Sequence, residues 1–267
     1  MYPSHWGLQK SPFRGCLDPR AFYQSPTHDE ALARLFFLVE QRRRLGLLMG
    51  PAGSGKSLLL EVAAQQLCRA GKAVARVNLL GVSPTEMLCL LAAELGLNVD
   101  PTSLLSSLWR TVLDRLAEYR YQQTQTVLLL DNADQAGRRV LGQLARLAQH
   151  DPSPESRLTL VLAGRYDRMG RLGDRLLDLA ELRIDVAAWQ ENETADYLRR
   201  SLAEAGRKSP VFDEPAVAKL HELTHGIPRR VSQLADLALV AGAGRQLKQI
   251  DAEVVESVYQ ELGVVEV

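Results

Sequence analysis

The stretch that decides the fold reads GPAGSGKS, residues 50–57, and it directly follows the apolar run LGLLM. Its spacing is G-x-x-x-x-G-K-S, in which glycines let a loop wrap around a polyphosphate while the following helix points its N-terminus at the phosphates. An apolar strand before the loop and a helical stretch after it supply the context that this motif requires. The sequence therefore predicts a phosphate-binding loop formed by Gly50, Pro51, Ala52, Gly53, Ser54, Gly55, Lys56, Ser57 and Leu58.

A second run, LLLDNAD at residues 128–134, ends an apolar stretch in a carboxylate, Asp131. A carboxylate in this position commonly holds Mg²⁺ together with the hydroxyl group of the phosphate-binding loop. We expect Lys56 to reach the β and γ phosphates of ATP, and Ser57 and Asp131 to ligate Mg²⁺. The alternatives are a glycine-rich turn matched by chance for the loop and a turn-initiating carboxylate for Asp131.

Asn132 stands where proteins that hydrolyse ATP often carry a second carboxylate. Its amide can orient a water molecule but cannot accept that water's proton. If the backbone stays extended, Asn132 and Asp134 share one side of the strand, and Asp134 could act as a displaced base. The alternative, equally open, makes Asp134 a loop carboxylate or a cap for the helix that starts near Arg138.

Strand-like and helix-like stretches alternate between residues 45 and 188, which is typical of a doubly wound α/β domain. Strands are expected at residues 45–49, 73–79, 126–130, 158–163 and 182–186, and helices at 56–70, 84–95, 104–121 and 138–150. From Trp189 onward only helical patterns occur, with Asn192 and Asp213 as expected N-caps. We predict a parallel five-stranded sheet followed by a small all-helical lid domain. The expected regions are an N-terminal arm and first helix packing on the core (1–44), the α/β domain (45–188) and the lid (189–267).

Composition narrows the classes of partner. The 267 residues carry 32 basic and 32 acidic side chains, so no overall charge favours a nucleic acid, and DNA contact would have to be local, for example at Arg42 to Arg44. No apolar run approaches the ~18 residues of a membrane helix, and the N-terminus lacks the pattern of a signal peptide. We therefore expect no membrane segment and a cytoplasmic location. The cysteines Cys16, Cys68 and Cys89 have unrelated spacings, which indicates neither a disulfide framework nor a zinc site.

These features together resemble an AAA+ ATPase of the general secretion pathway protein A (ExeA-like) family, with TnsC- and TniB-type transposition ATPases as relatives. The most specific match is N-terminal, in YPSHWGLQKSPF (residues 2–13) and DPRAFYQSPTHDEAL (residues 18–32). The resemblance implies an AAA+ P-loop NTPase fold, Mg²⁺-dependent ATP hydrolysis, and identical subunits that assemble into a ring or filament on ATP binding. It also implies that Phe22 and Tyr23 lie close to the nucleotide.

The resemblance further assigns roles to three arginines. LTLVLAGR, ending at Arg165, resembles the sensor 1 strand, although family members often end it in Gly-Gln. GIPRRV (226–231) resembles an element of the lid in which Arg229 would contact the γ-phosphate; a solvent-facing arginine at a helix start is the alternative. Arg175, or Arg171, is the candidate for the arginine that acts on the neighbouring subunit's ATP. Arg168, Arg171 and Arg175 are spaced to line one helix face, which could equally be an exposed basic face.

Two departures from the family pattern shape the expected function. Asn132 replaces the usual Glu, which puts the rate of hydrolysis in doubt, and the membrane segment and cell-wall-binding domain of longer members are not found. We expect an ATPase, slow in turnover, that couples ATP to oligomerisation and to remodelling of a partner. The alternative is a nucleotide-gated scaffold that acts on DNA, in transposition, or on secretion partners; a small-molecule kinase is a weaker third reading.

Overall fold

The computed structural model describes residues 2–13, 18–153 and 155–263, so Cys16 lies outside the described residues. The chain packs as two units. The first contains Met1–Thr27, Ala52–Gly55 and Ala187–Val267, and the second contains His28–Pro51 and Lys56–Val186. The second unit is the α/β domain, and the first is helical.

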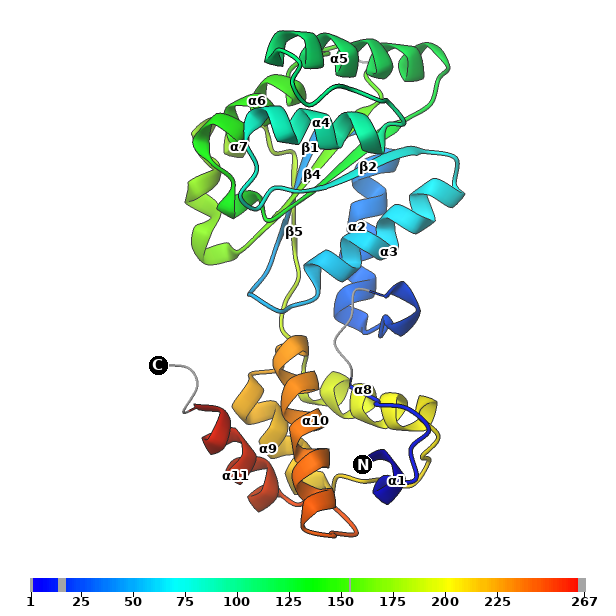
Figure 1. Cartoon of the computed structure of the whole chain (residues 1–267), viewed down its shortest axis with the longest axis vertical. Coiled ribbons are helices and arrows are strands. Elements are labelled where there is room, and N and C mark those ends of the chain that lie inside the picture. The colour runs from blue at the N-terminus through cyan, green and yellow to red at the C-terminus, as the bar shows by residue number, and fades with distance from the viewer. Residues whose placement is uncertain (1, 14–17, 154, 264–267) are drawn as a thin grey trace. The chain divides into compact units, whose positions relative to one another are not determined.

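Five parallel strands form the sheet of the α/β unit, in the order β2-β3-β4-β1-β5 (Figure 1). The central strands β3, β4 and β1 are mostly apolar, as expected for strands that are covered on both faces, whereas the edge strands β2 and β5 carry exposed polar residues in alternation. The predicted doubly wound, five-stranded parallel sheet is therefore confirmed. The bounds are β1 (Leu45–Met49), β2 (Ala73–Asn78), β3 (Thr126–Asp131), β4 (Leu158–Gly164) and β5 (Leu182–Asp185).

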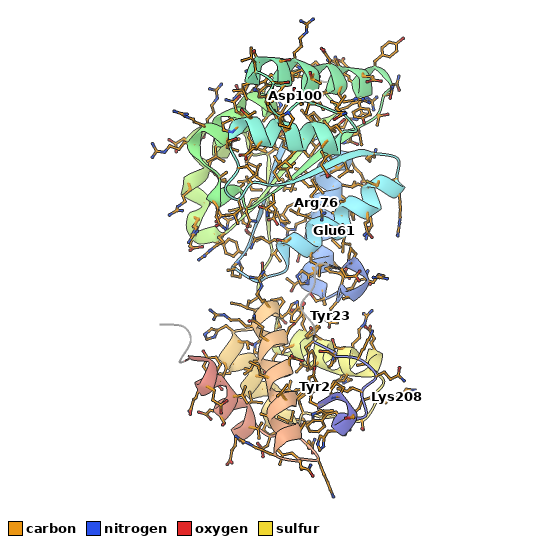
Figure 2. The ribbon with its side chains drawn as sticks, in the orientation of Figure 1. Tyr2, Tyr23, Glu61, Arg76, Asp100 and Lys208 are labelled. Atoms are coloured by element: carbon orange, nitrogen blue, oxygen red, sulfur yellow. The ribbon has the colours of Figure 1, made fainter. Side chains whose placement is uncertain are left out.

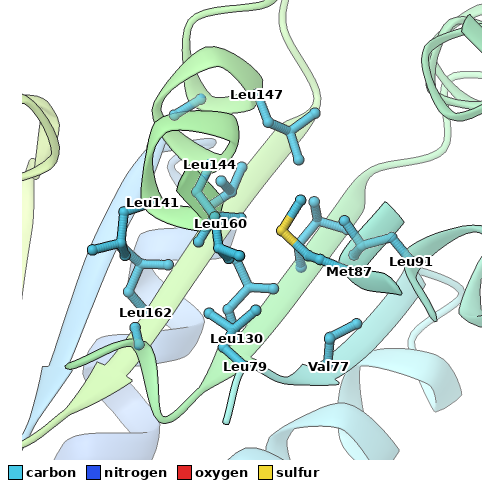
Figure 3. Packing of buried hydrophobic residues seen from close by; sticks show 14 of the residues in the cluster. Val77, Leu79, Met87, Leu91, Leu130, Leu141, Leu144, Leu147, Leu160 and Leu162 are labelled. Atoms are coloured by element: carbon cyan, nitrogen blue, oxygen red, sulfur yellow. The ribbon is translucent and has the colours of Figure 1, made fainter. Parts of the chain in front are cut away.

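Helices cover both faces of this sheet (Figure 1). Successive side chains of a strand point to opposite faces, so Leu45, Leu47 and Met49 of β1 join one apolar core, whereas Gly46 lies against Leu38 of α2. Figure 3 shows that core, where leucines of α6 meet Met87 and Leu91 of α4 above β2, β3 and β4. The helices of this unit are α2 (Pro26–Glu40), α3 (Lys56–Arg69), α4 (Pro84–Glu94), α5 (Leu105–Tyr121), α6 (Arg138–Ala148) and α7 (Asp174–Leu179), with 3-10 turns η2 (Ala133–Gln135) and η3 (Tyr166–Leu172).

The strand order fixes where polar strand ends meet. The C-terminal ends of all five strands share one edge of the sheet because the strands are parallel. Strand β4 pairs with β1 on one side and β3 on the other. The residue after β4, Arg165, therefore follows a strand that lies between the one leading into the phosphate-binding loop and the one ending at Asp131.

The helical unit contains both ends of the chain. Asp213 caps its α9 as predicted, since its side chain accepts a hydrogen bond from the Ala216 N–H group. The prediction of Asn192 as an N-cap is wrong, because Glu193 accepts a hydrogen bond from the Gln190 N–H group and the helix begins two residues earlier. The helices are α1 (Tyr2–Trp6), α8 (Glu191–Glu204), α9 (Glu214–Thr224), α10 (Pro228–Gly244) and α11 (Ala252–Gly263), with the 3-10 turn η1 (Pro19–Ala21).

The N-terminal arm belongs to the core of this helical unit. Trp6, Leu8 and Phe13 are buried among side chains of α8 to α11, and the Trp6 indole N–H donates to the Leu239 carbonyl oxygen at 2.8 Å. The Tyr2 hydroxyl, labelled in Figure 2, donates to the Asp236 carboxylate at 2.6 Å. Residues 2–13 and 18–27 thus belong with the C-terminal helices, whereas residues 28–44 belong with the sheet, so the expected region 1–44 divides between the units.

Within the described ranges, no helix combines the length and the apolar character needed to cross a membrane.

Candidate functional site

The phosphate-binding loop follows β1 and ends where α3 begins at Lys56. Gly53 and Gly55 adopt left-handed conformations, with φ of +82° and +94°, which side-chain-bearing residues rarely tolerate. Helix α3, 14 residues long, therefore starts with its free N–H groups at the loop, and these groups favour an anion. The Lys56 ammonium group donates to the carbonyl oxygens of Gly50 at 2.9 Å and Pro51 at 2.8 Å.

Two oxygen-bearing side chains meet beside this loop. The Ser57 hydroxyl donates to the Asp131 carboxylate at 2.5 Å, across 74 residues of sequence. The other carboxylate oxygen of Asp131 accepts the Asn132 N–H group at 2.8 Å, which fixes its orientation. Mg²⁺ takes oxygen ligands and commonly uses one carboxylate together with substrate phosphates and water. Ser57 and Asp131 are a suitable protein contribution to such a site.

Asn132 ends the extended strand abruptly. Its φ of +55° is left-handed, and residues 133–135 continue as a 3-10 turn, so the extended geometry that would align Asn132 with Asp134 stops at Asp131. The Asn132 amide instead donates to the Asn78 side-chain oxygen at 2.9 Å. Asn78 was not predicted as a site residue. The sequence signal was a polar side chain near the end of the expected strand 73–79, and the structure adds that Asn78 is in register with Asp131.

Asp134 lies inside the protein. It is 3% exposed, and its Oδ2 atom has no hydrogen-bond partner among the residues that the structure describes. Its carboxylate lies against Gly164 at the end of β4, where a Cβ atom would stand 3.2 Å from Asp134 Oδ1. The alternative that Asp134 caps α6 is wrong, because the N-cap is Gly137 and receives no side-chain cap.

Arg165 follows β4 directly and is held by a carboxylate next to it. Its Nε and Nη2 groups donate to the Asp167 carboxylate at 3.0 and 2.7 Å. These hydrogen bonds, followed by the charges of Asp167 and Asp134, raise the pKa of the Arg165 guanidinium. The same contacts lower the pKa of the Asp167 carboxyl group. Arg165 is thus a cation at the C-terminal edge of the sheet, paired with an exposed carboxylate.

The other predicted arginines of this region do not share a helix. Arg168 and Arg171 lie on the 3-10 turn η3, whereas Arg175 lies on α7 after Gly173, whose φ of +79° separates the two elements. The expectation of one arginine-lined helix face is therefore wrong. The exposed Arg175 side chain donates to the Gln149 side-chain oxygen at 2.7 Å.

The remaining candidates lie in the helical unit. The Arg229 N–H group donates to the Gly53 carbonyl oxygen at 3.2 Å, and a Cβ atom on Gly53 would come within 2.9 Å of Arg229 Cβ. Phe22 directly follows η1, and its N–H group donates to the Pro19 carbonyl oxygen. Tyr23, labelled in Figure 2, packs edge-on against Trp189 at 5.4 Å between ring centroids. Burial, followed by the charges of Asp196 and Glu193, raises the pKa of Tyr23.

Sequence comparison identifies the family. Residues 39–172, half of the chain, match the family described as "AAA domain". The chain belongs to the AAA domain family. Members of this family are generally ATPases. This AAA protein is also 29% identical over 249 residues to general secretion pathway protein A of Aeromonas hydrophila, a match that spans 92% of this chain and 45% of the relative. The chain therefore covers less than half the length of that curated relative.

Solved structures agree on the fold. Cdc6p of Pyrobaculum aerophilum matches 94% of this AAA protein and 70% of its own chain, with a TM-score of 0.74 and 17% identity. The ORC1 protein of Aeropyrum pernix, solved in complex with DNA, matches 92% and 68%, with a TM-score of 0.68 and 19% identity. At these identities the matches establish the P-loop AAA+ fold alone.

Proposed function

We propose that this AAA protein binds Mg²⁺-ATP, hydrolyses it slowly, and couples the nucleotide to self-assembly and to remodelling of a partner. The observation that carries the proposal is the 2.5 Å contact between Ser57 and Asp131, beside a loop with the full phosphate-binding motif. In this proposal Ser57 and Asp131 hold Mg²⁺, and Lys56 with the loop N–H groups of residues 50–58 binds the phosphates. Bound Mg²⁺ would neutralise charge that develops on the phosphates.

The slow turnover is proposed from the side chain at position 132. An amide cannot remove a proton from water, and general base catalysis typically contributes ~10²- to 10⁴-fold in rate. The amide of Asn132 is moreover engaged with Asn78. Positioning and charge stabilisation by Lys56, Mg²⁺ and an arginine would remain, with Arg165, Arg175 and Arg229 as the candidates.

Nucleotide binding and turnover are tested separately. Isothermal titration with ATP and Mg²⁺ should detect binding in the wild type and a loss of at least ~10-fold in affinity in Lys56→Ala, because the ammonium charge on the phosphates is removed. Steady-state phosphate release should be slow in the wild type and faster in Asn132→Glu, while Asn132→Gln serves as the control of equal length without a base. If Asn132→Glu turned over no faster than the wild type, the assigned role of Asn132 would be contradicted. Absence of ATP binding would contradict the function as a whole.

A second candidate function is a nucleotide-gated scaffold, whose output is assembly and whose hydrolysis only resets it. The relatives motivate two kinds of partner: one is a general secretion pathway protein, and another was solved with DNA. ATP-dependent growth in mass, measured by light scattering and unchanged in Asn132→Ala, would favour the scaffold. DNA association through Arg42 to Arg44 should weaken steeply as salt rises, and a response to salt that stays flat would remove DNA as a partner.

The proposal places Phe22 and Tyr23 near the bound nucleotide and Arg229 on its γ-phosphate. Support comes from the family pattern and from the hydrogen bond of Arg229 to Gly53 in the loop. A bound-state structure in which neither aromatic residue approaches the nucleotide would contradict the first assignment. If Arg229→Gln bound and turned over ATP as well as the wild type does, the assignment of Arg229 to the γ-phosphate would be contradicted.

A further inference from the structure

The side chain of Asp134 is buried at an unusual cost in free energy. It is 3% exposed, and one of its carboxylate oxygens is buried with no hydrogen-bond partner in the described part of the chain. Burying a carboxylate without a partner is strongly unfavourable, and buried charges in proteins are almost always paired. The buried carboxylate of Asp134 therefore requires a cationic partner within reach.

The backbone holds Asp134 in this place. The left-handed turn at Asn132 redirects the chain into the 3-10 turn η2, which carries Asp134 against the end of β4. Gly164 allows this approach, since a Cβ atom there would stand 3.2 Å from Asp134 Oδ1 and 3.3 Å from Asp134 Cβ. The carboxylate is thus packed beside the residue that immediately precedes Arg165.

Arg165 has hydrogen-bonding capacity to spare. A guanidinium carries five N–H donors, and two of those of Arg165 are engaged by Asp167. Asp167 is two residues away on the surface, with its side chain 58% exposed, and exposed ion pairs of this kind contribute little stability. The negative charge of Asp134 already acts on Arg165. Arg165 therefore has a weak exposed partner and a second, buried acceptor nearby.

The geometry points to Asp134 as a positioning residue for Arg165. We infer that the guanidinium exchanges between two carboxylates, the exposed Asp167 and the buried Oδ2 of Asp134, and that the second contact fixes Arg165 at the edge of the sheet where Asp131 ends. Only hydrogen bonds are made and broken in this exchange. No covalent bond changes, and Arg165 remains protonated throughout. The consequence for catalysis rests on the proposed ATPase function, whereas the exchange itself does not require nucleotide.

The exchange is tested without nucleotide by NMR of the Arg165 Nε–H group, assigned by its absence in Arg165→Lys. In Asp167→Asn the exposed partner is weakened, and we expect the Nε–H group to stay protected from solvent because Asp134 takes the guanidinium. The further change Asp134→Asn should then speed exchange by roughly 10-fold or more, as expected for loss of one charge-assisted hydrogen bond. Asp114→Asn, on the exposed face of α5, is the control. Loss of protection in Asp167→Asn alone would overturn the inference.

Should Asp134→Asn fail to fold, Gly164→Ala in the Asp167→Asn background replaces it, because the added Cβ atom presses on the Asp134 carboxylate. The expected result is again faster exchange of the Arg165 Nε–H group, and unchanged exchange would count against the inference. A second measurement separates this role from that of a displaced base. If Asp134 acts through Arg165, Asp134→Asn and Arg165→Gln should slow ATP turnover by similar factors, and the double variant should be no slower than the slower single one. Multiplied losses would assign Asp134 an independent role in the chemistry and overturn its role through Arg165.

Discussion

At Gly226 two backbones touch. His225 and Gly226 are consecutive left-handed residues, with φ of 51° and 64°, at the end of α9. The Trp189 N–H group donates to the Gly226 carbonyl oxygen at 2.9 Å, and a Cβ atom on Gly226 would collide with the Trp189 carbonyl oxygen. The glycine of the GIPRRV element is therefore required by contact with the segment before α8.

We expect Gly226→Ala to lower the free energy of unfolding of the helical unit by about 2–4 kcal/mol, from left-handed strain together with steric overlap. Gly244→Ala is the matched control, because Gly244 also lies in the helical unit but has no atom within 4 Å of its Cβ position. Urea denaturation followed by circular dichroism measures both variants. Equal stability of the two variants would contradict the contact with Trp189.

Some residues of the site follow from the sequence and others do not. Lys56, Ser57 and Asp131 are predictable because one short motif and one strand end specify them. Asn132 is of a residue type that adopts the left-handed conformation more readily than most, but residue type alone does not specify which asparagine does so, and the turn at this position is seen only in the structure. The burial of Asp134 depends on Gly164, 30 positions later, and only the folded sheet brings these residues together.

At the scale of elements, a single carboxylate ties the first turn of α2 to the start of α8. Glu193 is 4% exposed and accepts hydrogen bonds from the Thr27 N–H and hydroxyl groups and from the Gln190 N–H group. Burial by itself would raise the pKa of Glu193. The hydrogen bonds from Gln190, Thr27 and the Ser25 side chain outweigh that effect and hold the pKa below its ordinary value.

This lowered pKa predicts a dependence of stability on pH. The folded state favours ionised Glu193, so its contribution is fully present at neutral pH and is lost as pH falls from the ordinary glutamate range through the lower folded pKa. Glu193→Gln should reduce stability at pH 7, and the difference from wild type should shrink on acidification. Glu191→Gln, an exposed residue of the same helix turn, is the control. A difference that does not change between pH 7 and pH 3, measured by thermal unfolding, would contradict this account.

The strands were predictable to within one residue at each end because β1, β3 and β4 are mostly apolar and β2 and β5 alternate apolar and polar residues. Helix starts were predictable where a capping side chain is present, as at Asp213. The start of α8 was missed because Asn192 looks like a cap by residue type, whereas the Gln190 N–H group donates its hydrogen bond to the Glu193 carboxylate. The expected arginine-lined helix does not form, because Gly173 separates η3 from α7. The φ of +79° at Gly173 is a conformation for which glycine is the usual residue.

At the scale of the whole molecule, each unit has buried tryptophan: Trp6 and Trp189 in the helical unit, and Trp109 in the α/β unit. Trp6 is 1% exposed in the helical unit, and Trp109 is 3% exposed in the α/β unit, where its indole N–H donates to Gln143 at 2.7 Å. The two residues therefore report on separate cores. The place of Trp6 could not be read from the sequence, since its hydrogen-bond partners Leu239 and Arg207 lie 233 and 201 residues away.

Truncation of these tryptophans should act locally. We expect Trp6→Ala to cost about 3–5 kcal/mol in the helical unit, and Trp109→Ala to cost a similar amount in the α/β unit. Amide hydrogen exchange by mass spectrometry should show faster exchange in α8 to α11 for the first variant and in α4 to α6 for the second. Faster exchange in the sheet of Trp6→Ala, with α8 to α11 unaffected, would contradict the assignment of the arm to the helical unit.

The place of the arm has a consequence for synthesis of the protein. Residues 2–13 are translated before the sheet, yet the helices that bury Trp6, Leu8 and Phe13 are translated only after the whole sheet. The α/β unit can complete its core on the growing chain, while this aromatic segment stays exposed until α8 to α11 have emerged. Residues 2–13 are thus made before the sheet but buried after it, and a nascent chain stalled within the sheet would carry an apolar segment that chaperones can bind.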